Sequence, residues 1–214
     1  MRTLLIVFTL WSAALFGQET EIKNLLSNDA GIAHGGWGAP TFSYTRILDQ
    51  DAMLIGLRGG WIINHRLTIG IAGSGLVSDV ENPAHDALLA EQGMDLKRKS
   101  IFRTGYGGIL IEPVIAYSKP IHVSLPILIG AGGYGYSTFY DHDVIEERPN
   151  HIHDDFHSYF VLQPGIDLEL NIIPLLRLGI GASYRYTTDL EAAGTPEDGM
   201  RGMNATFSIK VGKF

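Results

Sequence analysis

The connections between the expected strands fall into two kinds, and their order constrains the fold more than any other feature of the chain. Alternation of apolar and polar residues predicts eight strands, over 31–47, 52–63, 67–80, 103–117, 121–140, 158–171, 175–188 and 201–214. The even-numbered connections are tight turns, around Asn64-His65-Arg66, Ser118-Lys119-Pro120 and Ile173-Pro174. Three of the four odd-numbered connections are long, over 81–102, 141–157 and 189–200. Because consecutive hairpins open at opposite ends of a sheet, we expect one end with short turns and one end with long loops.

The two faces of the strands indicate what surrounds the sheet. Along 158–171 the apolar face carries Phe160, Leu162 and Leu168, and the other face carries Asp167 and Glu169. The polar face is elsewhere rich in Gly, Ser and Thr, with scattered charges of both signs. Small residues and balanced charges suit a crowded interior better than a face in water, so we expect the apolar face to point outward, into lipid. The expected fold class is all-β: an eight-stranded antiparallel up-and-down transmembrane β-barrel.

Composition agrees with a single barrel domain. The 214 residues include 26 glycines and no cysteine, 18% of them are charged, and the mean hydropathy is +0.10. These values exclude a bundle of membrane helices but allow a barrel, in which only alternate residues face lipid. The net charge of −7 argues against nucleic acid as a partner.

The first residues have the pattern of an export signal. Arg2 precedes an apolar run over 4–11, and small residues follow it up to Gly17. We expect residues 1–17 to be a signal peptide cleaved before Gln18, with cleavage after Ala14 as the alternative. Residues 18–30 then form a polar periplasmic lead-in, and residues 31–214 form the barrel.

Two groups of residues are expected at particular places in the barrel. Charged residues of the polar face should form ion pairs inside it, since a buried charge without a partner is costly: Arg58, Glu112, Asp167, Glu169, Arg177 and Arg185. The alternative for Asp167 and Glu169 is a pair of catalytic acids. Aromatic residues near the strand ends should lie at the two membrane interfaces: Trp61 and Tyr117 beside short turns, and Tyr184 and Tyr186 toward the long loops.

The connection over 141–157 holds four of the eight histidines. His151, His153, Asp155 and His157 would share one face of an extended segment, and imidazoles and carboxylates are ligands for zinc and similar ions. This segment is a candidate metal half-site; the alternative is a solvated polar loop. The chain contains no nucleotide-binding or hydrolase motif, and no cofactor is expected.

The chain resembles the small eight-stranded outer-membrane β-barrels, the OmpA membrane domain and OmpX-like proteins. The resemblance covers 31–214 and rests on the layout, with local cues in the runs 35–38 and 58–64 and in the terminal Lys213-Phe214. It implies insertion by the barrel-assembly machinery, which recognises the last strand. Phe214 is out of phase with Phe207, Ile209 and Val211, and a bulge at Gly212 would restore the phase.

The function expected from these features is a non-enzymatic structural or surface-interaction role in the outer membrane of a Gram-negative-type envelope, as a monomer surrounded by lipid. Two alternatives stay open. One is a barrel enzyme acting on lipid or peptide at the membrane surface, with His157 and Ser158, or His85 and Asp86, as candidates. The other is a soluble, lipocalin-like barrel that holds an apolar ligand.

Overall fold

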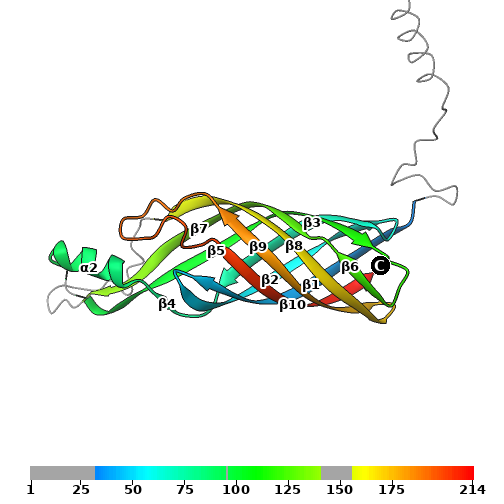
Figure 1. Cartoon of the computed structure of the whole chain (residues 1–214), viewed down its shortest axis with the longest axis horizontal. Helices are drawn as coiled ribbons and strands as arrows, with labels where there is room; N and C mark the ends of the chain where they lie inside the picture. Colours follow the sequence, from blue (N-terminus) through cyan, green and yellow to red (C-terminus); the bar gives the residue numbers. More distant parts are fainter. Residues whose placement is uncertain (1–31, 95, 141–155) are drawn as a thin grey trace, which may run out of the picture. The chain divides into compact units, whose positions relative to one another are not determined.

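The computed structural model describes residues 32–94, 96–140 and 156–214, which form ten strands and one helix (Figure 1). The chain divides into two units, 1–32 and 33–214, and all described strands belong to the second. The expected signal peptide and lead-in lie outside the described residues. In chain order the elements are β1 (His34–Ile47), β2 (Gln50–Ile63), β3 (Leu67–Leu76), β4 (Val80–Glu81), α2 (Pro83–Glu91), β5 (Leu96–Ile115), β6 (Ile121–Ser124), β7 (Ile127–Tyr140), β8 (His157–Ile173), β9 (Leu176–Thr187) and β10 (Gly202–Lys213).

The strands close into an antiparallel barrel with eight walls. Each wall pairs with the next along the chain, and β1 pairs with β10 as well as with β2, which closes the ring. β6 and β7 together form one wall, and β4 is a short addition to the extended end of β5. The predicted eight-stranded up-and-down barrel is confirmed. No helix in the described part of the chain is long and apolar enough to cross a membrane.

The two ends of the barrel differ as expected. One end, called here the turn end, carries the short connections after β2, β5 and β8 together with both ends of the barrel sequence, since Gly36 pairs with Lys213. The opposite end, called the loop end, carries α2 and the connection over 188–201. Among the loop-end connections that the structure describes, the one between β1 and β2 is tight, and Leu48 and Asp49 there have positive φ values, as a two-residue hairpin turn requires.

The barrel has an apolar exterior and a polar lumen. Leu57, Ile71 and Ile180 point outward and are 70%, 73% and 61% exposed, whereas their inward neighbours Arg58 and Asp167 are largely shielded. A soluble barrel has the reverse arrangement, with its apolar face inside. The exterior therefore needs an apolar surrounding, and the polar side chains must satisfy one another within the lumen.

The predicted fourth and fifth strands differ most from the observed ones. The fourth strand begins at Leu96 rather than at 103, because β5 continues beyond the belt of apolar residues and pairs with β7 as far as Tyr140, with register shifts near Arg98. The fifth strand is divided at Pro126, which has no N–H for a ladder; its carbonyl instead accepts a hydrogen bond from the Gly165 N–H. The long connection predicted over 81–102 contains α2, which runs from Pro83 to Glu91.

The last strand has no bulge at Gly212. Trp37 pairs with Gly212 in the same register in which Thr41 pairs with Ser208, so the alternation runs unbroken to the C-terminus. Phe214 therefore lies on the inward phase, and the Arg177 guanidinium carbon is 3.8 Å from the centre of its ring. The terminal aromatic residue contributes to the lumen rather than to the exterior.

Barrel closure can be tested by a disulfide between β1 and β10. Tyr44 and Ala205 are directly opposite and both face outward. Because the chain has no cysteine, the variant with Tyr44→Cys and Ala205→Cys should cross-link almost completely on mild oxidation of the folded protein, as seen by gel mobility with and without reductant. The control with Tyr44→Cys and Val211→Cys places the second thiol about 20 Å further along the strand and should not cross-link within one molecule. Equal cross-linking of both pairs would contradict this register.

Candidate functional sites in the lumen and at the loop end

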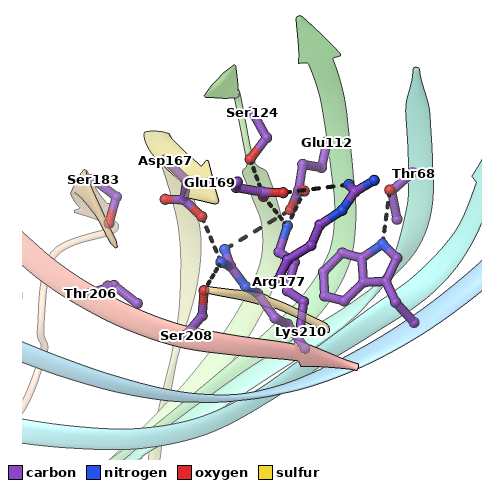
Figure 2. A network of polar contacts seen from close by, with 12 residues as sticks. Thr68, Glu112, Ser124, Asp167, Glu169, Arg177, Ser183, Thr206, Ser208 and Lys210 are labelled. Atoms are coloured by element: carbon purple, nitrogen blue, oxygen red, sulfur yellow. Dashed lines mark hydrogen bonds and ion pairs between the residues drawn. The ribbon is translucent and has the colours of Figure 1, made fainter. Parts of the chain in front are cut away.

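An ion network fills the half of the lumen nearer the turn end (Figure 2). Lys210 of β10 lies between Glu112 of β5 and Glu169 of β8 and donates to both carboxylates. Arg177 Nη1 lies 3.6 Å from Glu169 Oε2. Arg58 Nη2 lies 2.6 Å from Asp167 Oδ2, and Arg58 Nη1 lies 4.0 Å from Glu112 Oε2. The network thus links strands on opposite walls of the barrel.

Lys210 and His122 belong to this network but were not predicted from the sequence. Lys210 is only 1% exposed, and its Nζ lies 4.1 Å from the centre of the Trp37 ring. His122 Nε2 lies 3.1 Å from Glu169 Oε2, and Ser124 donates to the other oxygen of the same carboxylate. A usable signal existed, since Lys210 has the same parity as the polar residues Asn204, Thr206 and Ser208.

The network balances its own charge. Three cations, Arg58, Arg177 and Lys210, face three carboxylates, and His122 can donate to Glu169 as a neutral imidazole. Both candidate catalytic acids, Asp167 and Glu169, are held by cations within this network. This arrangement favours an ion cluster over a pair of acids available for proton transfer.

Arg185 does not take part in the network, contrary to its predicted role as an ion-pair member. It is fully buried, but its Nε donates to the Met200 carbonyl and its guanidinium nitrogens donate to Asn204 Oδ1 and Thr45 Oγ1. Its ring contact is Tyr106, at 5.6 Å. Neutral oxygens can satisfy this cation because Arg185 sits nearer the loop end, where the connection over 188–201 turns back and presents its carbonyl groups.

A small polar chamber and then an apolar plug lie between the ion network and the loop end. The chamber has a volume of about 60 Å³, and its lining combines the hydroxyl groups of Thr41, Ser43, Ser74 and Thr206 with apolar side chains such as Leu110 and Leu128. It has room for a few water molecules. Beyond it a buried cluster closes the lumen: its members include Ile47, Leu54, Val80, Phe102, Tyr134, Leu190 and Met200.

At the loop end, hydrogen bonds join α2 and the connection over 188–201 to β7; these two segments are called here the cap. Asn82 caps α2 by accepting hydrogen bonds from the N–H groups of Ala84 and His85. Its Nδ2 donates to the Tyr136 hydroxyl at 2.6 Å and to the Gly194 carbonyl at 2.9 Å. Tyr136 also bonds Thr195 at 2.6 Å. Tyr136 lies beyond the loop end of β3, outside the membrane-spanning part, and burial raises the pKa of its phenol.

The four predicted interface aromatics lie near the two ends of the barrel. Trp61 is half-exposed near the turn end and stacks on His34. Tyr117, in the turn after β5, stacks on His65 of the turn after β2. Tyr184 and Tyr186 lie near the loop end of β9, with ring centroids 4.4 Å apart. Their positions are those that membrane-interface residues require, and the interface role stays a prediction.

The metal prediction is untested, because His151, His153 and Asp155 lie outside the described residues. His157 begins β8 and stacks on Tyr134 at 5.3 Å. Within 32–94, 96–140 and 156–214, no group of three or more metal-ligating side chains could hold an ion.

The residues of the two candidate catalytic pairs do not face each other as an acid–base pair would. His85 stacks on Tyr136 at 3.8 Å, and Asp86 accepts a hydrogen bond from the Ser100 N–H. His157 and Ser158 are consecutive in β8, so their side chains point to opposite faces.

Comparison with solved structures finds proteins with a similar fold. Neisserial surface protein A matches with a TM-score of 0.55 and 11% identity over 86% of this chain and 99% of that protein. Weaker matches are the N-terminal β-barrel domain of Pseudomonas aeruginosa OprF (TM-score 0.44, 8% identity, 82% and 96% covered) and the attachment invasion locus protein Ail of Yersinia pestis (TM-score 0.44, 12% identity, 84% and 96% covered). No protein-family model and no curated protein matches the sequence. The chain has the fold of the small eight-stranded outer-membrane β-barrels.

The contribution of Lys210 to the free energy of unfolding can be measured directly. Lys210→Met leaves Glu112 and Glu169 without their shared cation, and the free energy of unfolding should fall by about 3–5 kcal/mol. Urea titration of the protein in detergent micelles checks this value. The double variant Lys210→Met with Glu112→Gln removes one charge of each sign and should regain part of the loss. A single variant as stable as the parent protein would contradict the central role of Lys210.

The cap at the loop end gives a second prediction. Tyr136→Phe removes the hydroxyl shared by Asn82 and Thr195, and each lost hydrogen bond contributes about 1 kcal/mol. We expect faster amide hydrogen exchange over 82–94 and 190–200, with little change in the walls of the barrel. Tyr44→Phe, which removes an exposed hydroxyl bonded to Asp51, is the control and should leave exchange in both segments unchanged. Unchanged exchange in Tyr136→Phe would show that Tyr136 does not hold the cap.

Proposed function

We propose that this protein is an integral outer-membrane barrel with a non-enzymatic structural or surface-contact role, whose barrel anchors the folded cap at the loop end. The observation that carries the proposal is the combination of an apolar exterior with a lumen packed along its length. In this proposal residues 1–17 direct export and the loop end faces the cell exterior.

The exterior supports placement in a membrane. Large apolar side chains with at least a third of their surface exposed occur on every wall of the barrel, from Phe42 on β1 to Val211 on β10. In water, so continuous an exposed apolar surface would drive aggregation. In a bilayer it is the surface that lipid tails contact, with Trp61 and Tyr117 toward one interface and Tyr184 and Tyr186 toward the other.

The lumen supports an anchor rather than a pore. The ion network crosses one half, the apolar plug fills the other, and the chamber between them holds about 60 Å³. At the turn end Phe214 lies over Arg177, and Trp37 packs beside Leu110 and Ile62. Such a barrel leaves no continuous path for solutes.

The assignment of a non-enzymatic role rests on the partners of the reactive groups. The lumen carboxylates are held by cations, and His85 and His157 stack on tyrosines. These contacts occupy the reactive groups of the described residues, so an enzyme is the weaker candidate. Insertion by the barrel-assembly machinery would use the outward side chains of β10, such as Phe207 and Val211, since Phe214 faces inward.

A substitution on the apolar exterior of the barrel tests the membrane placement. Ile71→Arg places a charge on the exterior near the middle of β3, and we expect it to lower the free energy of unfolding in lipid vesicles by about 2–4 kcal/mol. The control Ala193→Arg, at the loop end, should have little effect. Equal stability of both variants, or a folded protein that stays dispersed without detergent, would contradict an outer-membrane barrel.

Conductance tests the anchor role separately. The purified barrel in planar bilayers should show no steady conductance, because the lumen is closed in both halves. A stable open-channel current from the unmodified protein would instead indicate a pore.

A further inference from the structure

A pocket of about 160 Å³ opens at the loop end, between α2, the start of β8 and the connection over 188–201. Leu88 and Leu89 of α2 form one side, and Ala192 and Ala193 form the other. The lining also includes Tyr136, on whose ring His85 is stacked, together with His157 and Gln92. We call this space the loop-end pocket. It is separate from the lumen chamber and takes no part in the ion network.

The pocket suits a single bulky apolar group. An apolar cavity of about 150 Å³ in a protein accommodates one benzene molecule, so this space can hold one aromatic ring or one branched aliphatic side chain. Its walls offer methyl and methylene groups, and the imidazoles of His85 and His157 lie among its lining groups. A lining that combines apolar side chains with a few polar groups suits an anchor pocket at a protein interface.

The segments that build the pocket are strongly acidic. Residues 82–94 and 189–200 contain six carboxylates and neither Lys nor Arg, and the adjoining positions carry four cations, Lys97, Arg98, Lys99 and Arg201. Asp86, Glu91 and Glu191 each adjoin a lining residue in the sequence. Arg201 pairs with Asp189, and Lys99 pairs with Glu81. Carboxylates still outnumber cations over 82–100 and 189–201, by seven to four. A cationic partner would be attracted to this surface and an anionic one repelled.

The pocket is formed before any ligand arrives. Asn82 joins the start of α2 to Tyr136 and to the Gly194 carbonyl, and Tyr136 is bonded in turn to Thr195. The Ala192 N–H donates to the Tyr134 hydroxyl at 2.9 Å. Both sides of the pocket are therefore fixed to β7. A partner would not have to order them, which lowers the entropic cost of binding.

We propose that the loop-end pocket receives one bulky apolar side chain of a Lys- or Arg-rich polypeptide, while the carboxylates around it bind the flanking cationic side chains. The inference deepens the proposed surface-contact role and rests on it, since the pocket must face the exterior to meet such a partner.

Short peptides test the pocket and the charge independently. The probes are the amidated, acetylated peptides Lys-Lys-Phe-Lys-Lys, Lys-Lys-Ala-Lys-Lys and Glu-Glu-Phe-Glu-Glu, titrated against the full barrel in detergent micelles by fluorescence anisotropy. Burial of the phenyl group should make the first peptide bind about tenfold more tightly than the second. The third should not bind, and high ionic strength should weaken the first two. Equal affinity for the Phe and Ala peptides, or binding of the acidic peptide, would overturn the proposal.

Variants test whether the preference for the Phe peptide arises at the loop-end pocket. Ala193→Trp fills the pocket, and Leu88→Asp makes its wall polar; either should abolish the preference for Phe over Ala. The control Ala205→Trp, on the exterior of the barrel wall, should keep the preference. Glu91→Gln with Glu191→Gln should weaken both basic peptides, whereas Asp49→Asn, in the β1–β2 turn, should not. A Phe preference that survives in both pocket variants would overturn the site.

Failure of this proposal is distinguishable from failure of the proposed function. Each variant is first checked for its heat-dependent gel migration and for the absence of conductance, which report on the membrane barrel alone. A folded, non-conducting barrel without a Phe preference would leave the anchor role standing and remove the pocket assignment.

Discussion

Lys210 and the two carboxylates that hold it are the interaction on which the interior of this barrel depends. An apolar exterior forces the polar residues inward, and a narrow lumen has too little room for water to solvate isolated ions. The charges must therefore neutralise one another in pairs. Glu112 and Glu169 approach from two walls and Lys210 from a third, so the network also joins strands that share no backbone ladder.

The same constraint explains why the lumen changes character along its length. Near the turn end the inward positions carry charges, and Phe214 and Trp37 cover the cations with ring faces. Near the loop end they carry Ile47, Leu54 and Phe102, which pack against Leu190 and Met200 from the connection over 188–201. That connection is drawn into the mouth because it supplies both the apolar side chains and, at Met200, the carbonyl that Arg185 requires. The loop end is thus a folded cap, with α2 fastened to it through Asn82.

Much of the barrel could be predicted from the chain, and the failures have identifiable causes. Strand number, topology and the direction of each face followed from a period of two and from the lengths of the connections. The extension of β5 over 96–102 was missed because its ladder partner in β7 lies about forty residues away and the composition of this segment is typical of a loop. Parity correctly placed five charges of the ion network inside the barrel, but Lys210 was not predicted, and neither was the choice of partners. Arg185 has the same inward parity as Arg177 yet bonds neutral oxygens, because the strands place it at another height in the lumen.

The sequence by itself determined that this chain forms a barrel with its apolar residues outside, because side-chain alternation and connection length are local properties. Only the tertiary structure decided which charges meet and that the terminal phenylalanine turns inward. It alone brought α2, β7 and a distant connection together around one pocket. These outcomes depend on register and on the stagger of strands around a closed ring, and both are set when the first and last strands pair.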